Sequence, residues 1–235
     1  KNVRIPQELK PVMKKVKEYF NLRPDKYYSK LADDKIFHIY FPGRTFFEPQ
    51  KIRIRKRSVK TELKKITYLY SFCDYDSFII PDIKKKYRVS FKKISYRKNR
   101  GIYIYHENSG KLSYVDTDYN RRRKRYETFL NRIYPVILLE DNLPPEISIL
   151  FSENALLIRG EPLIINITDI GMGITESGIE LKIDNNPVFF RYDFTRRWIK
   201  LLTDFLDLGE HQISVSVKDR GGNISSTNRA FTVVE

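Results

Sequence analysis

The chain has 235 residues, of which 41% are hydrophobic and 31% charged, and its formal net charge is +15. Aromatic residues at 14% exclude a disordered chain, the lack of a long apolar run excludes a membrane-spanning helix, and a single cysteine excludes an internal disulfide framework. The chain starts at Lys1 and shows no signal peptide, so we expect a piece of a longer protein.

The charge is divided unevenly along the chain. Residues 1–139 hold 35 basic and 14 acidic residues, whereas residues 140–235 hold 9 basic and 15 acidic ones. A change of sign this large predicts two separate domains. Pro144-Pro145 lies at the change, and paired prolines are typical of a domain boundary because they extend the backbone. The expected boundaries are 1–30 (helix or linker), 31–140 (basic domain) and 141–235 (acidic domain).

In the first half, residues 8–20 place apolar side chains at three- and four-residue steps, which predicts a short N-terminal helix. From residue 35 apolar and polar residues alternate, which predicts half-buried antiparallel strands. The expected strands cover residues 35–41, 51–57, 65–72, 87–91, 101–106, 111–115 and 132–139. Asn108-Ser109-Gly110 predicts a hairpin turn, and Pro135 predicts that the last strand is an edge strand or carries a bulge.

The second half continues in short alternating strands separated by turns. The expected strands cover residues 146–151, 162–169, 179–184, 187–193, 197–202, 211–219 and 229–234. About seven strands in a segment of this length are typical of an immunoglobulin-like sandwich. The chain is therefore predicted to be all-β, with two antiparallel β-sandwich domains, the second immunoglobulin-like, and a short N-terminal helix.

The acidic domain resembles a recurring module of bacterial envelope proteins. The residues that carry the resemblance are Asp141 to Ile147, Asp169-Ile170-Gly171-Met172-Gly173-Ile174, Ile183-Asp184-Asn185, Leu206 to His211 and Asp219 to Asn223. Such modules follow the catalytic domain in some lysostaphin-like (M23) cell-wall metallopeptidases. The basic domain is similar to the sandwich that precedes the module in those proteins. The residues concerned are Ile39 to Pro49, Gly101 to Tyr105 and Pro135 to Pro145.

The resemblance implies an extracytoplasmic, C-terminal, non-catalytic region. The zinc site of that family uses a His and an Asp, followed later by a His-x-His pair. The three histidines of this chain, His38, His106 and His211, are too far apart in sequence to match this pattern. We therefore expect no catalytic residue here, although the parent protein can carry a peptidase domain upstream.

Other catalytic or metal-binding patterns are equally weak. Asp116, Asp118, Asn120 and Glu127 match part of a calcium-binding EF-hand loop, but the run Arg121–Arg125 would repel a cation, and the loop lacks its required glycine. A polar turn between strands is the better interpretation. No phosphate-binding glycine loop or nucleophile motif is present in the sequence. We predict no metal site and no cofactor.

The basic residues are the main functional signal. A domain with this excess of Lys and Arg attracts polyanions over about 8–10 Å in physiological salt. A merely solvated surface is the competing interpretation. The candidate polyanion- or partner-binding residues are Arg53, Arg55, Arg57, Lys84, Lys85, Lys86, Arg121, Arg122, Arg123 and Arg125.

The favoured function is a non-catalytic binding or spacer region of a bacterial envelope protein, in the periplasm or cell envelope. Its basic face would contact an anionic cell-wall polymer, the membrane surface or an acidic protein partner. The alternative is a nucleic-acid-binding protein that uses the same basic face, because basic strands with interleaved tyrosines can stack bases. No RRM, OB or KH signature supports that alternative in the sequence.

Overall fold

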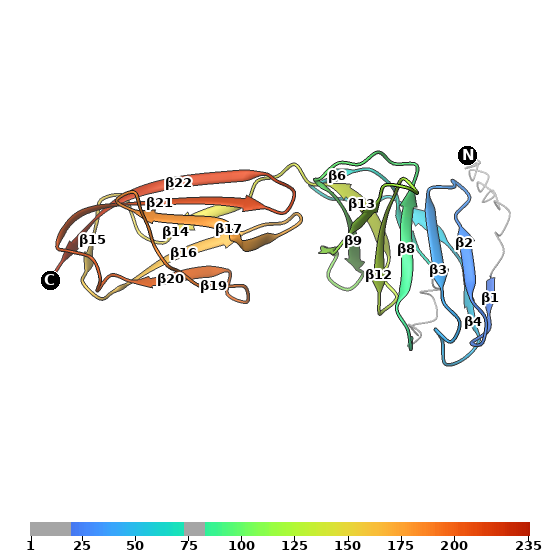
Figure 1. Cartoon of the computed structure of the whole chain (residues 1–235). Helices are drawn as coiled ribbons and strands as arrows, with labels where there is room; N and C mark the ends of the chain where they lie inside the picture. The colour runs from blue at the N-terminus through green and yellow to red at the C-terminus, as the bar shows by residue number, and fades with distance from the viewer. Residues whose placement is uncertain (1–19, 73–82) are drawn as a thin grey trace, which may run out of the picture.

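The computed structural model describes residues 20–72 and 83–235 and shows two all-β lobes that lie end to end (Figure 1). The N-terminal lobe comprises the described residues up to Glu140, and the C-terminal lobe comprises residues 141–235. No sheet in the described part of the chain contains strands from both lobes. The predicted all-β class is confirmed. No helix long and apolar enough to cross a membrane occurs among the described residues.

In the described part of the N-terminal lobe, thirteen strands form three sheets. The strands are β1 (Phe20–Leu22), β2 (Tyr28–Leu31), β3 (Phe37–Phe41), β4 (Gln50–Ile52), β5 (Arg55–Arg57), β6 (Lys64–Lys65), β7 (Leu69–Ser71), β8 (Tyr87–Lys92), β9 (Arg100–His106), β10 (Lys111–Val115), β11 (Asp118–Asn120), β12 (Arg125–Leu130) and β13 (Val136–Glu140). The two larger sheets have the orders β10-β9-β13-β7-β5, with β6 also paired to β13, and β11-β12-β8-β3-β2.

The two larger sheets of this lobe pack over an aromatic core. Alternate residues of β3 and β8 point inward, so Phe37 and Phe91 are fully buried. The ring of Phe37 lies 4.6 Å from that of Tyr70, on the opposite sheet, and 5.5 Å from that of Phe91. Burying one such ring contributes about 2 kcal/mol, so this cluster is a main source of the stability of the lobe.

In the C-terminal lobe, nine strands form two sheets. The strands are β14 (Glu146–Ile149), β15 (Ala155–Ile158), β16 (Pro162–Thr168), β17 (Ile174–Ile183), β18 (Asn186–Pro187), β19 (Tyr192–Asp193), β20 (Trp198–Leu202), β21 (Gly209–Asp219) and β22 (Ile224–Val234). The sheet orders are β14-β16-β20-β19 and β15-β22-β21-β17-β18. All pairings are antiparallel except β15 with β22. Ile165 and Ile199 of one sheet and Val215 of the other belong to one buried core.

A loop of the C-terminal lobe packs into the N-terminal lobe at the junction. Met172 precedes β17 and is only 6% exposed. It belongs to a hydrophobic cluster that otherwise comes from the N-terminal lobe and includes Tyr103 and Ile137. The linker residue Asp141 donates its backbone N–H to the carbonyl of Asn99 at 2.7 Å. The junction therefore has a packed apolar contact as well as polar contacts.

Several local expectations need correction. Pro135 does not place the following strand at an edge, because β13 lies between β9 and β7 inside its sheet. Pro135 comes just before the strand, and its carbonyl accepts the N–H of Tyr105 at 2.9 Å. Strands β1, β2, β11, β12 and β15 were not expected. The predicted helix over residues 8–20 lies outside the described residues except for Phe20, which begins β1.

The start of the N-terminal lobe also differs from the expected boundary at residue 31. β1 and β2 both belong to this lobe, and the side chain of Leu22 is 2% exposed in its core. The expected hairpin at residues 108–110 is present, because β9 and β10 pair with each other across that turn. Gly110 has a φ of 67°, the left-handed conformation that glycine adopts most easily.

Candidate functional site

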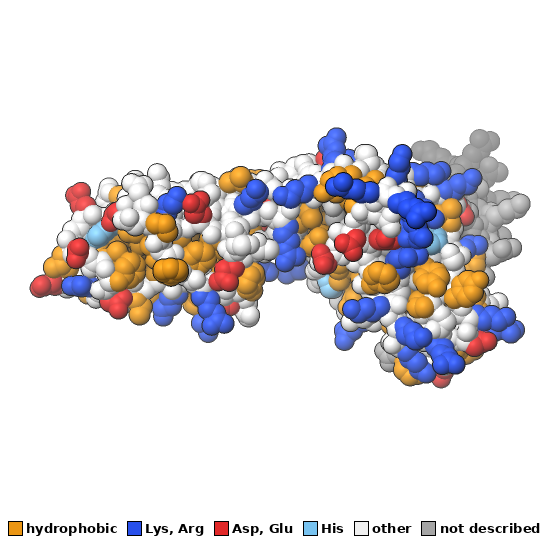
Figure 2. Space-filling view, viewed as in Figure 1, with side chains coloured by type: hydrophobic (Ala, Val, Ile, Leu, Met, Phe, Trp, Pro, Cys, Tyr) orange, Lys and Arg blue, Asp and Glu red, His pale blue; other side chains and the backbone are white. Residues whose placement is uncertain are grey.

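Lys and Arg side chains gather on the N-terminal lobe on the face shown in Figure 2. Part of this charge lies on the outer face of the sheet formed by β11, β12, β8, β3 and β2. Because side chains alternate along a strand, burial of Tyr87, Val89 and Phe91 places Arg88 and Lys92 on the outer face. Arg125 of β12 pairs directly with Lys92 of β8.

The charges on this face are close enough to perturb one another. Burial, together with the charges of Arg125, Arg88 and Arg123, lowers the pKa of Lys92. One carboxylate, Glu127, partly balances the group. Its Oε2 lies 2.5 Å from Nη2 of Arg125 and 3.8 Å from Nε of Arg88. A positive excess remains, because one carboxylate faces several cations.

The turn between β11 and β12 adds four exposed cations, Arg121, Arg122, Arg123 and Lys124. None of the four forms an ion pair with any described residue. The guanidinium of Arg121 lies 6.0 Å from the ring centroid of the exposed Tyr96. We call Arg88, Lys92, Arg121, Arg122, Arg123, Lys124 and Arg125 the cationic cluster.

The turn is shaped by local contacts that present these cations to solvent. The side-chain oxygen of Asn120 accepts the N–H of Arg123 at 3.0 Å, and Lys124 adopts a φ of 46°. Asn120 also donates to Oε1 of Glu127 at 3.1 Å, which ties the turn to β12. The residues that were expected to form a polar turn, part of the weak EF-hand match, therefore form a β-hairpin that displays positive charge.

The remaining predicted basic residues lie elsewhere on the lobe. Lys84, Lys85 and Lys86 are exposed and precede β8, so they lie at the opposite end of that strand from Lys92. Nζ of Lys84 lies 4.1 Å from the ring centroid of Phe47. Nζ of Lys85 donates to the carbonyl of Gly43 at 3.2 Å.

The predicted residues Arg53, Arg55 and Arg57 lie on or next to the sheet that contains β5, β7, β13, β9 and β10. Arg53 and Arg55 are half-buried, and Arg57 of β5 forms an ion pair with Glu107 at 2.6 Å. The predicted set is therefore divided among three places. Among its members, the structure joins Arg121, Arg122, Arg123 and Arg125, and it adds Arg88 and Lys92.

Arg125 differs from the exposed binding residue that the sequence suggested. It is 4% exposed and is held against Glu127. Other cations of this lobe are also balanced. Lys64 and Arg100 donate to the buried Glu140 at 3.0 and 2.7 Å and hold its pKa at about 2, although burial alone would raise that pKa. The hairpin turn is consequently the exposed part of the cationic cluster.

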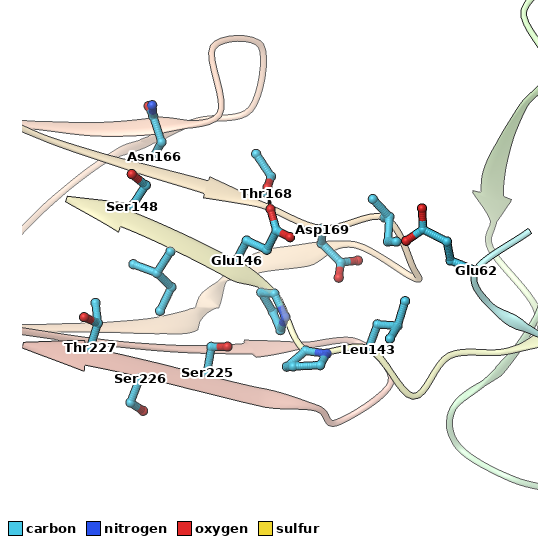
Figure 3. A pocket seen from close by; sticks show the side chains of 14 residues that line it. Glu62, Leu143, Glu146, Ser148, Asn166, Thr168, Asp169, Ser225, Ser226 and Thr227 are labelled. Carbon is cyan, nitrogen blue, oxygen red and sulfur yellow. Dashed lines mark hydrogen bonds between the residues drawn. The ribbon is translucent and has the colours of Figure 1, made fainter. Parts of the chain in front are cut away.

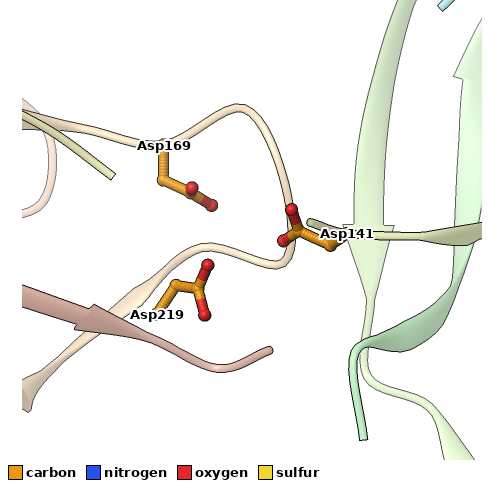
Figure 4. A group of neighbouring side chains, drawn as sticks. All are labelled: Asp141, Asp169 and Asp219. Atoms are coloured by element: carbon orange, nitrogen blue, oxygen red, sulfur yellow. The ribbon is translucent and has the colours of Figure 1, made fainter. Parts of the chain in front are cut away.

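The junction carries a second group of charges, which sequence reasoning did not identify as a site. Asp141 follows β13, Asp169 follows β16, and Asp219 ends β21 (Figure 4). One carboxylate oxygen from each residue lies within 4.8 Å of the others. Asp141 is fully buried, Asp219 is 4% exposed, and Asp169 is half-buried. We call these three residues the aspartate cluster.

Backbone N–H groups orient the carboxylates. Oδ2 of Asp141 accepts the N–H of Met172 at 2.7 Å, and Oδ2 of Asp169 accepts that of Gly173 at 2.6 Å. Oδ1 of Asp219 accepts the N–H of Asn223 at 2.8 Å. Burial, together with the charges of Asp141 and Asp219, raises the pKa of Asp169 to about 6, against the opposing effect of the backbone N–H groups that it accepts. Each aspartate begins one of the motifs that carry the family resemblance, which is the signal that could have identified them together.

A groove of about 820 Å³ lies beside this cluster (Figure 3). Its lining comes from β14, β16, β22 and the linker, with Glu62 from the N-terminal lobe. The charged side chains in the lining are Glu62, Glu146 and Asp169, all acidic. The groove therefore does not suit an anionic ligand, and the cationic cluster lies outside it.

The three histidines do not meet. His38 bonds Ser29 at 2.8 Å on the outer sheet face of the N-terminal lobe. His106 bonds Ser113 at 3.0 Å within the β9–β10 hairpin. His211 lies in the C-terminal lobe, where Nδ1 is 2.6 Å from the carboxylate of Asp184. In the part of the chain that the structure describes, the aspartate cluster is the one group of three or more acidic, His or Cys side chains close enough to share a metal ion.

No protein-family model matches the chain, and no curated protein matches it. Solved structures with some likeness include the endo-β-1,4-mannanase of Thermotoga petrophila, at 14% identity and a TM-score of 0.34, over 41% of this chain and 21% of the mannanase. CopC of Methylosinus trichosporium OB3b has 14% identity and a TM-score of 0.30, over 37% of this chain and 93% of CopC.

A third likeness is to SGBP-B of the Bacteroides ovatus mixed-linkage glucan utilization locus, solved with a heptasaccharide. It has 14% identity and a TM-score of 0.24, over 91% of this chain and 65% of that protein. The chain spans about a fifth of the length of the mannanase. TM-scores of this size assign neither a function nor a partner to the chain.

Proposed function

We propose that this chain is a non-catalytic binding region of a bacterial envelope protein, and that the cationic cluster attaches it to an anionic cell-wall polymer. The observation that carries the proposal is the β11–β12 turn, which exposes four consecutive cations that form no ion pair with any described residue. A polymer with regularly spaced phosphates or carboxylates can contact several of these cations at once. Such binding releases counterions and weakens steeply as salt rises.

The extracytoplasmic location and the lysostaphin-like parent are parts of the same proposal. They are supported by the motifs at Asp141–Ile147, Asp169–Ile174 and Asp219–Asn223, which resemble the accessory module of those enzymes. The C-terminal lobe then serves as a spacer. Its formal charge is negative, so it does not compete with the N-terminal lobe for an anionic polymer.

Co-sedimentation with purified cell-wall sacculi tests the proposal. The chain is compared with a variant carrying Arg121→Ser, Arg122→Ser and Arg123→Ser, which removes three exposed charges and leaves the buried Arg125–Glu127 pair intact. The control carries Arg191→Ser, Arg196→Ser and Lys200→Ser, which remove the same charge from exposed positions of the C-terminal lobe. We expect at least tenfold weaker sedimentation for the first variant and wild-type behaviour for the control.

Two further arms separate the possible polyanions. Sacculi stripped of attached anionic polymer should lose most of the binding, and duplex or single-stranded DNA should bind more weakly than intact sacculi. Equal binding of the two triple variants would contradict the proposal. Tight, salt-sensitive binding to nucleic acid without sedimentation on sacculi would favour the nucleic-acid alternative.

A further inference from the structure

Three neighbouring negative charges without a cation are costly. The side chains of Asp141 and Asp219 are buried, and the half-buried Asp169 has a carboxylate oxygen within 4.8 Å of theirs. No Lys, Arg or His among the described residues forms an ion pair with any of them. Backbone N–H groups satisfy some of the oxygens, but they bring no full positive charge. Buried charges of one sign are normally compensated by an ion of the opposite sign.

Two unsatisfied buried polar atoms, one within the cluster and one in its electrostatic field, point to a ligand of the cluster. Oδ1 of Asp169 is buried and has no hydrogen-bond partner in the structure. The hydroxyl of Tyr103 also has no hydrogen-bond partner in the structure, and the whole side chain is buried. After burial itself, the charges of Asp141 and Asp169 are among the largest influences that raise the pKa of Tyr103, so its hydroxyl lies in the field of the cluster.

We propose that Asp141, Asp169 and Asp219 bind one Ca²⁺ ion at the junction of the two lobes. All three ligands are carboxylate oxygens, which hard cations prefer. Ca²⁺ binds oxygens at about 2.3–2.6 Å, so two oxygens on opposite sides of one ion can be about 5 Å apart. One oxygen from each carboxylate lies within 4.8 Å of the others, so one such ion can reach all three. Ca²⁺ accepts a flexible set of oxygen ligands, whereas Mg²⁺ demands a near-ideal octahedron and keeps several of its waters, so a site built from protein oxygens favours Ca²⁺.

The positions of the ligands give the ion a structural role. Asp141 belongs to the linker, whereas in the C-terminal lobe Asp169 follows β16 and Asp219 ends β21. The backbone carbonyl of Asp141 also accepts hydrogen bonds from two side chains in different lobes. The donors are Asn99 of the N-terminal lobe, at 3.0 Å, and Asn223 of the C-terminal lobe, at 3.2 Å. An ion at this place fixes the linker to the C-terminal lobe and thereby sets the angle between the lobes. This role is independent of polyanion binding.

Calorimetric titration of the metal-stripped chain with CaCl₂ tests the proposal. We expect one binding site per chain, and we expect the temperature of unfolding to rise by at least 5 °C in 1 mM CaCl₂ and to fall again with EDTA, because an ion that binds only the folded state stabilises it. MgCl₂ should bind at least tenfold more weakly. Small-angle scattering should show a narrower range of lobe arrangements with Ca²⁺ than with EDTA.

Matched variants locate the site. Asp169→Asn keeps the shape of the side chain and should reduce Ca²⁺ affinity at least tenfold. Asp193→Asn, at the end of β19 in the same lobe, should bind as the wild type does, because its carboxylate instead accepts the N–H groups of Thr195 and Arg196. No heat and no thermal shift in wild type at 10 mM CaCl₂ would overturn the proposal, even if the variants fail to fold. Equal affinity of Asp169→Asn and wild type, or equal affinity for Mg²⁺, would overturn it as well.

Discussion

His38 shows how the cationic cluster affects a single residue. Its ring bonds Ser29 at 2.8 Å, and the side chain is 8% exposed on the outer face of β3. Burial, with the charges of Lys92 and Arg125, lowers the pKa of His38 to about 4, from an ordinary value of 6.5. The folded state therefore favours the neutral ring, whereas the unfolded chain takes up a proton as the pH falls below 6.5.

This difference gives a pH prediction at the residue scale. Above pH 6.5 the His38 ring is neutral in both the folded and the unfolded chain, and its contribution to stability is complete. This contribution is lost as the pH falls from 6.5 towards 4. Between pH 7.5 and 5.0 the free energy of unfolding should therefore fall by about 2 kcal/mol through His38 alone.

Urea unfolding of wild type and His38→Gln at the two pH values measures this loss. The variant should lose about 2 kcal/mol less than wild type on acidification. An identical pH dependence for wild type and His38→Gln would show that the cations do not act on this ring as described.

At the scale of elements, the loop before β17 joins the lobes through Met172. Met172→Ala should lower the free energy of unfolding by about 2 kcal/mol, because it leaves a cavity among residues of the N-terminal lobe. Ile170→Ala in the same loop is the control, since its side chain is 57% exposed. Urea unfolding followed by circular dichroism measures both variants. Equal stability of the two would mean that Met172 does not contribute to the junction.

The strands also show how far local pattern predicts this fold. The alternation of residue types in the sequence was enough to predict β3, β8, β9 and β10. It failed for β12, because Arg125 is one of five consecutive cations, which suggested a turn. In the structure, Tyr126, Thr128 and Leu130 face the core, and Arg125 pairs with Glu127, two residues further along the same strand. The pairing of β12 with β8, which brings Arg125 next to Lys92, is a tertiary contact and cannot be read from local sequence.

The candidate sites also differ in how much of each could be predicted from the sequence. The exposed turn Arg121–Lys124 was predictable because its charge is continuous in sequence. The contribution of Arg88 and Lys92 depends on strand pairing, and the aspartate cluster depends on three positions that are 28 and 50 residues apart along the chain. Sequence motifs named each aspartate, but only the folded chain brings their carboxylates within 4.8 Å.

At the scale of the whole molecule, the basic and the acidic lobe lie at opposite ends of an elongated chain. The lobes lie end to end, so the basic N-terminal lobe can lie against a surface while the C-terminal lobe extends away from it (Figure 1). The face shown in Figure 2 carries its Lys and Arg mainly on the N-terminal lobe. This arrangement agrees with the proposed binding of an anionic polymer, for which we expect a marked dependence of affinity on salt.

The most direct test of that account is the affinity for a labelled poly(glycerol phosphate) chain, measured by fluorescence anisotropy from 50 to 300 mM NaCl. The account predicts that log Kd rises with log salt with a slope of at least about 3, and that replacing Arg121, Arg122 and Arg123 by Ser lowers that slope by roughly 2–3. Binding that does not depend on salt, or a slope that the triple substitution leaves unchanged, would contradict it.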